Sequence, residues 1–252
     1  MVIKIGGGNL AGGALEDLPD LLSAGHRIAI VHGGGLQLTR VLDALGIASQ
    51  FHEGLRVTDE ETIEVAENVF AGGVNKGLVR GLGDLGVQAA GISGTDGPTL
   101  LVEPVPDLGR VGRVVRVGSQ LIEALWAGGF VPVVAPLGLG PEGAYNVNAD
   151  SAAAALAVGL GAGHLFLLTD VDGLLEEGET VGTLDPHGCE AYVESGLAAG
   201  GMVPKLRAAA EAARGGVEAR ILNGNRKGAL GAAVAGERIG TLISEGVAAC
   251  KQ

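Results

Sequence analysis

Residues Arg27–Gly35 read RIAIVHGGG, a short apolar run that ends in a histidine and three glycines. A similar run opens the chain, because Val2–Gly8 reads VIKIGGG. Between the two, apolar residues from Leu15 to Leu22 recur with the spacing of one helix face,. Strands that end in glycines and lead straight into helices are typical of an open, largely parallel sheet. The first 45 residues therefore predict an α/β fold.

The rest of the chain continues this alternation. Further helices are expected at Leu36–Leu45, Asp59–Phe70, Val74–Leu85, Ser119–Ala127, an Asp150-capped Ser151–Leu160, Pro186–Ser195 and Val203–Arg214,. Further strands are expected at Val87–Ile92, Val131–Val134, His164–Thr169, Ala219–Leu222 and Arg238–Leu242, with a β-hairpin within Leu100–Val117,. A loop rich in Gly and Asn precedes Asp150. The sequence becomes rich in predicted turns after about residue 167. This change predicts an N-terminal lobe of residues 1–167 and a C-terminal lobe of residues 168–252.

Composition limits the kind of core and the kind of partner. The chain is 47% hydrophobic but only 3% aromatic, so its core must consist of Ala, Val, Leu and Ile,. A formal net charge of −12 repels nucleic acid and anionic membranes, which argues against binding to either,. The same charge repels small anions. Any anion site must therefore be built locally, from a few cations and backbone N–H groups.

Compartment signals are weak but agree with one another. Cys189 and Cys250 lie far apart and match no metal or redox spacing, which fits a reducing cytosol,. No basic segment followed by a long apolar stretch opens the chain, so no signal peptide is expected. The apolar run from Ser151 to Leu168 is better explained by a helix that leads into a strand than by a membrane span. We expect a soluble cytoplasmic protein.

Two features near the N-terminus could carry chemistry. Lys4 interrupts an apolar strand just before a glycine cluster, at the sheet edge where open α/β folds place their ligands,. A solvated lysine on an edge strand is the competing interpretation.

After His32, Gly33–Gly35 would allow backbone N–H groups to approach an anion at a helix N-terminus. The chain has neither a G-x-G-x-x-G fingerprint nor a P-loop,. An esterase-type oxyanion loop is a weak alternative, because the expected G-x-S-x-G partner fails at Thr95.

Three further segments could contribute polar groups. Asn146, Asn148 and Asp150 alternate, so in an extended segment their side chains would converge on a carboxylate substrate or on lysines,. Asp150 could instead be a simple helix N-cap. Lys205 stands at the start of a predicted helix, where a cation is unfavourable unless an anion lies nearby, although a surface lysine remains possible. Arg56 could grip a carboxylate with both arms of its guanidinium group.

Together these segments resemble the amino acid kinase family. The matching pieces are KIGG at Lys4–Gly7, VHGGG at Val31–Gly35, GLRVT at Gly54–Thr58, NVNAD at Asn146–Asp150, TDVDGL at Thr169–Leu174 and GMVPK at Gly201–Lys205. They occur in the family's order over nearly the whole chain. Thr95 departs from the pattern, since relatives often carry lysine there.

The resemblance implies a fold and a set of roles. The fold would be a three-layer α/β/α sandwich with a mainly parallel open central sheet, whose N-terminal lobe binds an acyl-amino acid and dimerises while the C-terminal lobe binds ATP. The implied catalytic residues are Lys4, Lys205, Asp150, Gly7 and Gly34. The implied substrate-binding residues are Gly34, Gly35, Arg56, Asn146 and Asn148. The implied ATP-binding residues are Gly6, Gly7, Asp170, Val171, Asp172, Gly173, Leu174, Leu175, Gly201, Met202 and Lys205.

The activity implied is transfer of the γ-phosphoryl group of ATP to the side-chain carboxylate of N-acetyl-L-glutamate, a step of arginine biosynthesis. An ionised carboxylate needs no general base, which agrees with the lack of a Ser/His nucleophile pattern. Mg²⁺ would arrive with ATP and be held mainly by the phosphates, with no dedicated protein metal site. The alternatives are a sibling kinase that acts on carrier-linked 2-aminoadipate and a non-catalytic nucleotide-binding regulator. Because the chain begins three residues before Lys4, the resemblance favours a homodimer without arginine inhibition.

Overall fold

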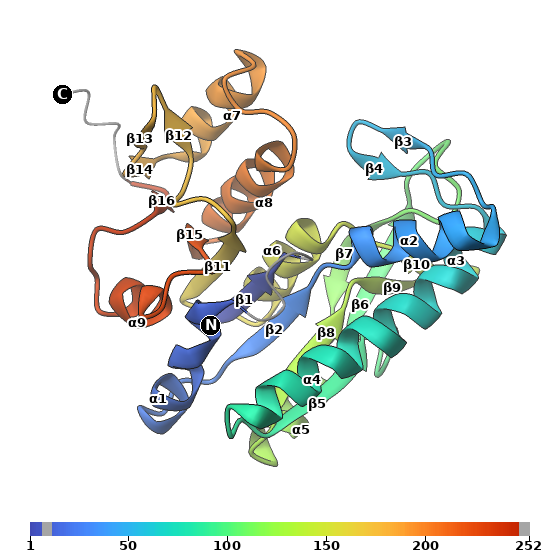
Figure 1. Cartoon of the computed structure of the whole chain (residues 1–252), viewed down its shortest axis with the longest axis horizontal. Coiled ribbons are helices and arrows are strands. Elements are labelled where there is room, and N and C mark those ends of the chain that lie inside the picture. The colour runs from blue at the N-terminus through green and yellow to red at the C-terminus, as the bar shows by residue number, and fades with distance from the viewer. Residues whose placement is uncertain (7–11, 247–252) are drawn as a thin grey trace.

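The computed structural model describes residues 1–6 and 12–246, and an eight-stranded sheet forms its centre (Figure 1). In spatial order the strands are β14 (Thr183–Leu184), β16 (Thr241–Ile243), β15 (Glu218–Asn223), β11 (His164–Thr169), β1 (Val2–Ile5), β2 (Ala29–His32), β8 (Val131–Ala135) and β5 (Ala89–Ser93). Neighbouring strands run parallel except β15 and β16. The expected mainly parallel open sheet is confirmed.

Helices cover both faces of this sheet. One face packs against α5 (Gln120–Ala127), α6 (Ala149–Gly159) and α8 (Met202–Arg214), with α7 (Pro186–Glu194) against α8. The other face packs against the short helix η1 (Gly13–Asp17), α1 (Leu18–Ser23), α4 (Asn75–Asp84) and α9 (Ala229–Val234). The arrangement is the α/β/α sandwich that the resemblance implied.

Smaller elements complete the fold. A four-stranded sheet has the order β10 (Gly143–Asn146), β9 (Leu137–Gly140), β6 (Leu100–Pro104), β7 (Gly112–Val117). Two hairpins consist of β3 (Phe51–His52) with β4 (Leu55–Arg56), and of β12 (Leu175–Glu176) with β13 (Glu179–Thr180). The helix α2 (Gly35–Leu45) packs against α3 (Glu60–Glu67). The predicted hairpin within Leu100–Val117 is confirmed as β6 and β7.

The alanine content explains how the helices pack so closely to the sheet. The buried residues of α6 include Ala152–Ala154 and Ala157, and those of α8 include Ala208–Ala210. Small side chains let the two helices approach each other and the strands beneath them. A core built mainly from Ala, Val, Leu and Ile is confirmed, although Tyr145 and Phe166 are also buried.

Some predicted boundaries were wrong. The helices expected at residues 59–70 and 74–85 are joined by a π-helical segment, η2 (Asn68–Val74), so that α3, η2 and α4 follow one another without a break. The Gly- and Asn-rich stretch expected to be a loop contains the hairpin β9–β10, because glycines leave room for the Val102 and Tyr145 side chains. The last strand begins at Thr241 rather than at Arg238.

The predicted lobe boundary after residue 167 falls inside β11, which pairs with β1 on one side and β15 on the other. The central sheet is therefore continuous across it, and the division into two lobes stays a prediction. Among the described residues, no helix combines the length and apolar character that crossing a membrane requires. Cys189 is buried and not in a disulfide, while Cys250 lies outside the described residues.

Candidate active site

Two lysines far apart in the sequence meet at one carboxylate. The Lys4 Nζ lies 2.9 Å from Asp150 Oδ1, and the Lys205 Nζ lies 3.6 Å from the same oxygen. All three side chains are largely buried, with exposed fractions of 6%, 12% and 7% for Lys4, Lys205 and Asp150. A buried cluster of two cations and one anion carries excess positive charge, so it is suited to receive a further anion.

Strand and helix geometry explains this meeting. Side chains alternate across a strand, so Ile3 and Ile5 face the layer of α1 and α4 while Lys4 faces α6 and α8,. Asp150 lies in the first turn of α6, and Lys205 lies in the first turn of α8. The N-termini of both helices therefore lie near Lys4, and helix N-termini favour anions.

The surroundings shift the titration of Lys205. Burial lowers the pKa of the Lys205 ammonium from its ordinary value, and the nearby Lys4 lowers it further. The Asp150 carboxylate acts in the opposite direction. Asp150 thus favours the charged form of Lys205 in a poorly solvated place,.

A cavity of about 240 Å³ opens beside this cluster. Its lining includes Lys4, Asp150, Gly33–Gly35, Arg56, Asn146 and Asn148. Gly34 has no room for a side chain, because a Cβ there would lie 2.8 Å from the Phe70 ring. The predicted glycine turn is thus one wall of the same cavity that holds the predicted lysine and aspartate.

Arg56 also lines the cavity. Its Nη2 donates to Thr39 Oγ1 at 2.6 Å and to the Gly35 carbonyl at 3.3 Å, and its Nη1 donates to Ser49. The guanidinium carbon lies 4.6 Å from the centre of the Phe51 ring. Burial lowers the pKa of Arg56 from its ordinary value, yet a guanidinium group stays charged,. The result is a cation held in place at the lining of the cavity that Lys4 also lines.

The two asparagines play different parts. Asn146 ends β10, and its amide donates to Thr58 Oγ1 at 3.1 Å. Asn148 is the N-cap of α6, with its side-chain oxygen accepting from the backbone N–H groups of Asp150 and Ser151. The prediction that Asp150 caps this helix was therefore wrong, because the chain turns two residues earlier. All three still line the cavity.

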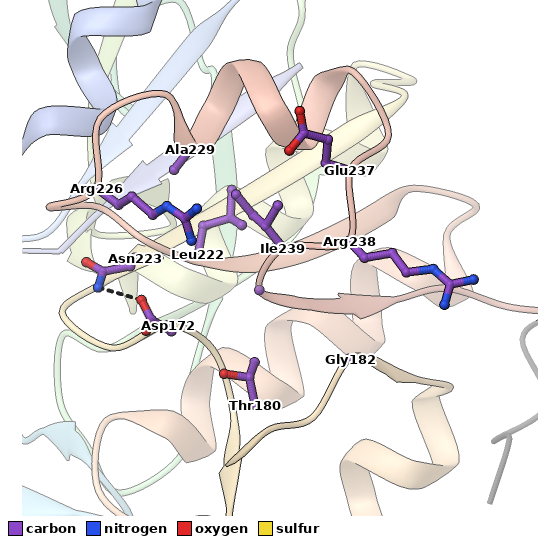
Figure 2. Close-up of a pocket in the computed structure, with 11 residues that line it drawn as sticks. Asp172, Thr180, Gly182, Leu222, Asn223, Arg226, Ala229, Glu237, Arg238 and Ile239 are labelled. Carbon is purple, nitrogen blue, oxygen red and sulfur yellow. Dashed lines mark hydrogen bonds between the residues drawn. The ribbon is translucent and has the colours of Figure 1, made fainter. Parts of the chain in front are cut away.

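The segments expected to bind nucleotide are the stretch that follows β11 and the residues at the start of α8. Leu174 is buried, and its N–H donates to Thr241 Oγ1 at 2.8 Å. Asp172 lines a second cavity, of about 370 Å³, and accepts a hydrogen bond of 2.8 Å from the Asn223 amide. Figure 2 shows these two side chains pointing toward each other, with Arg226 next to Leu222. The lining of this cavity includes Asp172 but not Asp170, Gly201 or Lys205.

Comparison with known proteins adds a second kind of observation. The model of the amino acid kinase family matches residues 1–223. The chain belongs to this family. It is 70% identical over 245 residues to the acetylglutamate kinase of Rubrobacter xylanophilus, a match that covers 97% of each chain.

Other relatives of this amino acid kinase family member agree. The acetylglutamate kinase of Zymomonas mobilis is 43% identical over 242 residues, with 88% of this chain and 80% of that protein covered. A solved structure, smu.665 from Streptococcus mutans, superimposes with a TM-score of 0.86 at 29% identity, covering 96% of this chain and 97% of that one. The resemblance inferred from the six motifs is confirmed at the level of the family and the fold.

The structure also adds site residues that sequence reasoning missed. Phe51 and Phe70 line the cavity, and Thr39 and Ser49 hold Arg56. No motif marks them, because they come from the hairpin β3–β4, from η2 and from the middle of α2. Gly7, predicted as both catalytic and ATP-binding, lies outside the described residues.

Two alternative interpretations lose their basis. Lys4 is a buried ion-pair partner rather than a solvated lysine on an edge strand. An esterase would need a histidine next to a serine nucleophile. The His32 ring nitrogens instead face the Gly33 carbonyl and the Asn75 amide, at 2.8 and 3.1 Å. Ser93 accepts hydrogen bonds from Thr95, which the α/β-hydrolase interpretation does not explain.

Proposed function

We propose that this member of the amino acid kinase family transfers the γ-phosphoryl group of ATP to the side-chain carboxylate of N-acetyl-L-glutamate. One observation carries the proposal: a buried carboxylate, Asp150, pairs with both Lys4 and Lys205 beside a cavity that is also lined by Arg56. The sequence relatives in Rubrobacter xylanophilus and Zymomonas mobilis, both named acetylglutamate kinase, support this acceptor.

The reaction needs charge stabilisation more than covalent help. One oxygen of the acceptor carboxylate forms a bond to the γ-phosphorus while the bond from that phosphorus to the β,γ-bridging oxygen breaks, and ADP leaves with the electron pair. Negative charge is spread over the transferring group throughout. Lys4 and Lys205 are the cations that meet this charge, and Asp150 positions both of them.

Binding of the acceptor follows from the rest of the cavity. Acetylglutamate carries a second carboxylate at its α-carbon, and Arg56 is the cation suited to hold it at a distance from the lysines. Asn146 and the backbone at Gly35 line the same cavity and can hydrogen-bond the acetamido group,. Asn148 supports the site chiefly by capping α6, because its oxygen is already engaged. The Gly34 N–H would donate to the transferring group.

We expect ATP and its Mg²⁺ to bind together. Family membership implies ATP use, and we assign its binding to the segment Asp170–Leu175 and to residues 201–205. Among the described residues, no three His, Cys, Asp or Glu side chains are grouped so that they could hold a metal ion. Asp150, a carboxylate that lines the cavity, is already paired with two ammonium groups. The residues present thus fit Mg²⁺ that arrives on the phosphates of ATP, where it neutralises part of their charge.

Some predictions about the protein as a whole remain predictions. These are the homodimeric state, the lack of arginine inhibition and the cytoplasmic location. The first two can be measured together, by light scattering of the purified protein and by rate measurements with added arginine.

The test of the proposed function is trapping of the acyl phosphate. Hydroxylamine converts an acyl phosphate to a hydroxamate, which forms a coloured complex with added ferric iron, so product can be followed with N-acetyl-L-glutamate, glutamate, aspartate and 2-aminoadipate as acceptors. We expect rapid hydroxamate formation with acetylglutamate only. Lys205→Ala should lower kcat by about 10²-fold or more. Lys227→Ala is the matched control, since Lys227 is exposed and paired with Glu16. Equal rates for glutamate, or an unaffected kcat in Lys205→Ala, would contradict the assignment.

A further inference from the structure

A buried histidine lies directly behind the glycine turn, on the side opposite the two lysines. His32 is the last residue of β2 and is fully buried. It pairs in register with Ile5, so its side chain faces the layer of α1 and α4, whereas Lys4 faces α6 and α8,. The ring therefore supports the turn from behind and does not line the cavity. No role in the reaction described above uses it.

The hydrogen bonds around the ring assign its tautomer. Asn75 directs its amide nitrogen at the carbonyls of Val133, at 2.9 Å, and Ile92, at 3.3 Å. Carbonyls accept and do not donate, so this end of the amide must be the NH₂ group. Lys76 donates to the Asn75 oxygen at 3.1 Å, which fixes the amide the same way. Because the NH₂ group also faces His32 Nε2 at 3.1 Å, Nε2 is the acceptor.

A neutral imidazole with an accepting Nε2 carries its proton on Nδ1. The Nδ1–H then donates to the Gly33 carbonyl at 2.8 Å. Burial lowers the pKa of His32 to about 4, and the nearby Lys76 adds to this effect. The ring thus stays neutral near pH 7, with one tautomer selected by Asn75.

This bond orients the next N–H group. The carbonyl of Gly33 and the N–H of Gly34 belong to one planar trans peptide unit, in which they point in opposite directions,. A Gly33 carbonyl that points back to His32 therefore directs the Gly34 N–H forward, to the side of the turn that lines the cavity. Within the described residues the Gly34 N–H donates to no protein acceptor, whereas the Gly33 N–H donates to the Ile5 carbonyl.

The surrounding backbone is shaped for the same arrangement. The π-helical segment η2 leads directly into α4. Phe70 in η2 meets Gly34, and Asn75, the first residue of α4, meets His32, so this continuous run of helix supports two parts of the turn. Gly91 leaves the space for the amide, since a Cβ there would lie 1.8 Å from the Asn75 oxygen.

We propose that His32 and Asn75 are positioning residues, which hold the Gly33–Gly34 peptide so that the Gly34 N–H donates to the phosphoryl group in transfer. The proposal rests on the proposed function, because it assigns a purpose to that N–H group. Its effect is confined to the transition state, where the charge on the transferring oxygens is best met by a fixed donor.

Two substitutions separate the two nitrogen atoms of the ring. Asparagine carries its amide nitrogen as many bonds from Cβ as Nδ1, so His32→Asn can still donate to the Gly33 carbonyl but cannot reach Asn75. Glutamine carries its amide oxygen one bond further out, near the place of Nε2, so His32→Gln can still accept from the Asn75 amide but loses the donor to Gly33,. Both remove the ring, so both lose comparable packing. His187→Gln is the surface control, since that side chain is 89% exposed.

The expected result is a split between kcat and KM. His32→Gln should lower kcat by about 10²-fold with KM values for both substrates within about threefold, because a misdirected donor weakens the transition state alone. His32→Asn should recover at least about tenfold of that loss, although melting temperatures of the two variants are similar. Equal kcat values for the two variants would overturn the proposal. An inactive wild-type chain would instead overturn the proposed function, so the two failures are distinguishable.

A second measurement does not depend on activity or on how well the variants fold. The ¹⁵N chemical shifts of the histidine rings report which nitrogen carries the proton, and the His32 signals can be assigned by correlation with the backbone resonances of the wild-type protein. We expect a neutral ring protonated on Nδ1 from about pH 5.5 to 8 in the wild-type protein. A ring protonated on Nε2, or one that titrates near its ordinary pKa, would overturn the proposal even if neither variant can be purified.

Discussion

The substitution Asp150→Asn tests the centre of the site. It keeps the shape of the side chain but removes the single negative charge between Lys4 and Lys205. At 2.9 and 3.6 Å, each pair has a Coulomb attraction of roughly 5 kcal/mol when the effective dielectric constant is about 20,. Desolvation offsets much of this in the intact cluster. Removing one partner leaves the other charges buried and unpaired, which costs about 3–5 kcal/mol.

We therefore expect the free energy of unfolding to fall by about 3–5 kcal/mol in Asp150→Asn, measured by urea denaturation near neutral pH. The deficit should also depend on pH in a defined direction. Without Asp150, the pKa of Lys205 falls further below its ordinary value, so the folded protein binds fewer protons than the unfolded chain. Stability of the variant then rises with pH up to the ordinary lysine pKa near 10.5,.

The kinase assay supplies the functional side of the same test. Loss of the anchor for both ammonium groups should lower kcat by about 10²-fold or more. ATP with Mg²⁺ should stabilise the variant more than it stabilises the wild type, because the phosphates replace the missing anion. Asp185→Asn is a control of the same chemistry outside the proposed site, where the carboxylate accepts from the backbone N–H of Gly188 at the start of α7. A stability change below about 0.5 kcal/mol would refute the reasoning, since it would mean that the cluster is well solvated.

Three further predictions follow from single contacts. Arg56→Lys should raise KM for acetylglutamate by at least about tenfold in steady-state assays and leave KM for ATP nearly unchanged. The reason is that an ammonium group cannot form the planar fork of a guanidinium group,. A higher KM for ATP alone would mean that Arg56 does not belong to the acetylglutamate site. Gly34→Ala should lower stability by about 1–3 kcal/mol in thermal unfolding, because its Cβ would lie 2.8 Å from the Phe70 ring, and an unchanged melting temperature would contradict that packing,. The pKa of His32 is lowered to about 4, so between about pH 6.5 and 4 the unfolded chain binds a proton that the folded chain does not bind,. The free energy of unfolding should therefore fall by about 3 kcal/mol as the pH is lowered across that range. Urea denaturation of His32→Asn should show a correspondingly smaller loss, and equal losses would refute the shift.

Much of the fold was predictable because local patterns agree with the tertiary structure. The all-buried strands β1 and β2 are continuous apolar runs that end where glycine becomes necessary. The predictions failed where a local pattern permitted more than one structure. The glycines near residue 140 indicated a loop, but there they make room for Tyr145 between strands. The π-helical segment was missed because its pattern differs from that of an α-helix by a single residue per turn,.

The sequence by itself determined which chemical groups are available and in what order: two lysines, an aspartate, an arginine and a glycine turn after a strand. These are local facts, since motif spacing and strand alternation depend on neighbours along the chain. Tertiary structure alone decided that Lys4 and Lys205, 201 positions apart, share one carboxylate oxygen, and that Asn148 rather than Asp150 caps α6. It also decided that Asn75 sets the tautomer of His32. Such contacts depend on how β1, α4, α6 and α8 pack around the sheet, and packing brings together residues whose separation in sequence carries no signal.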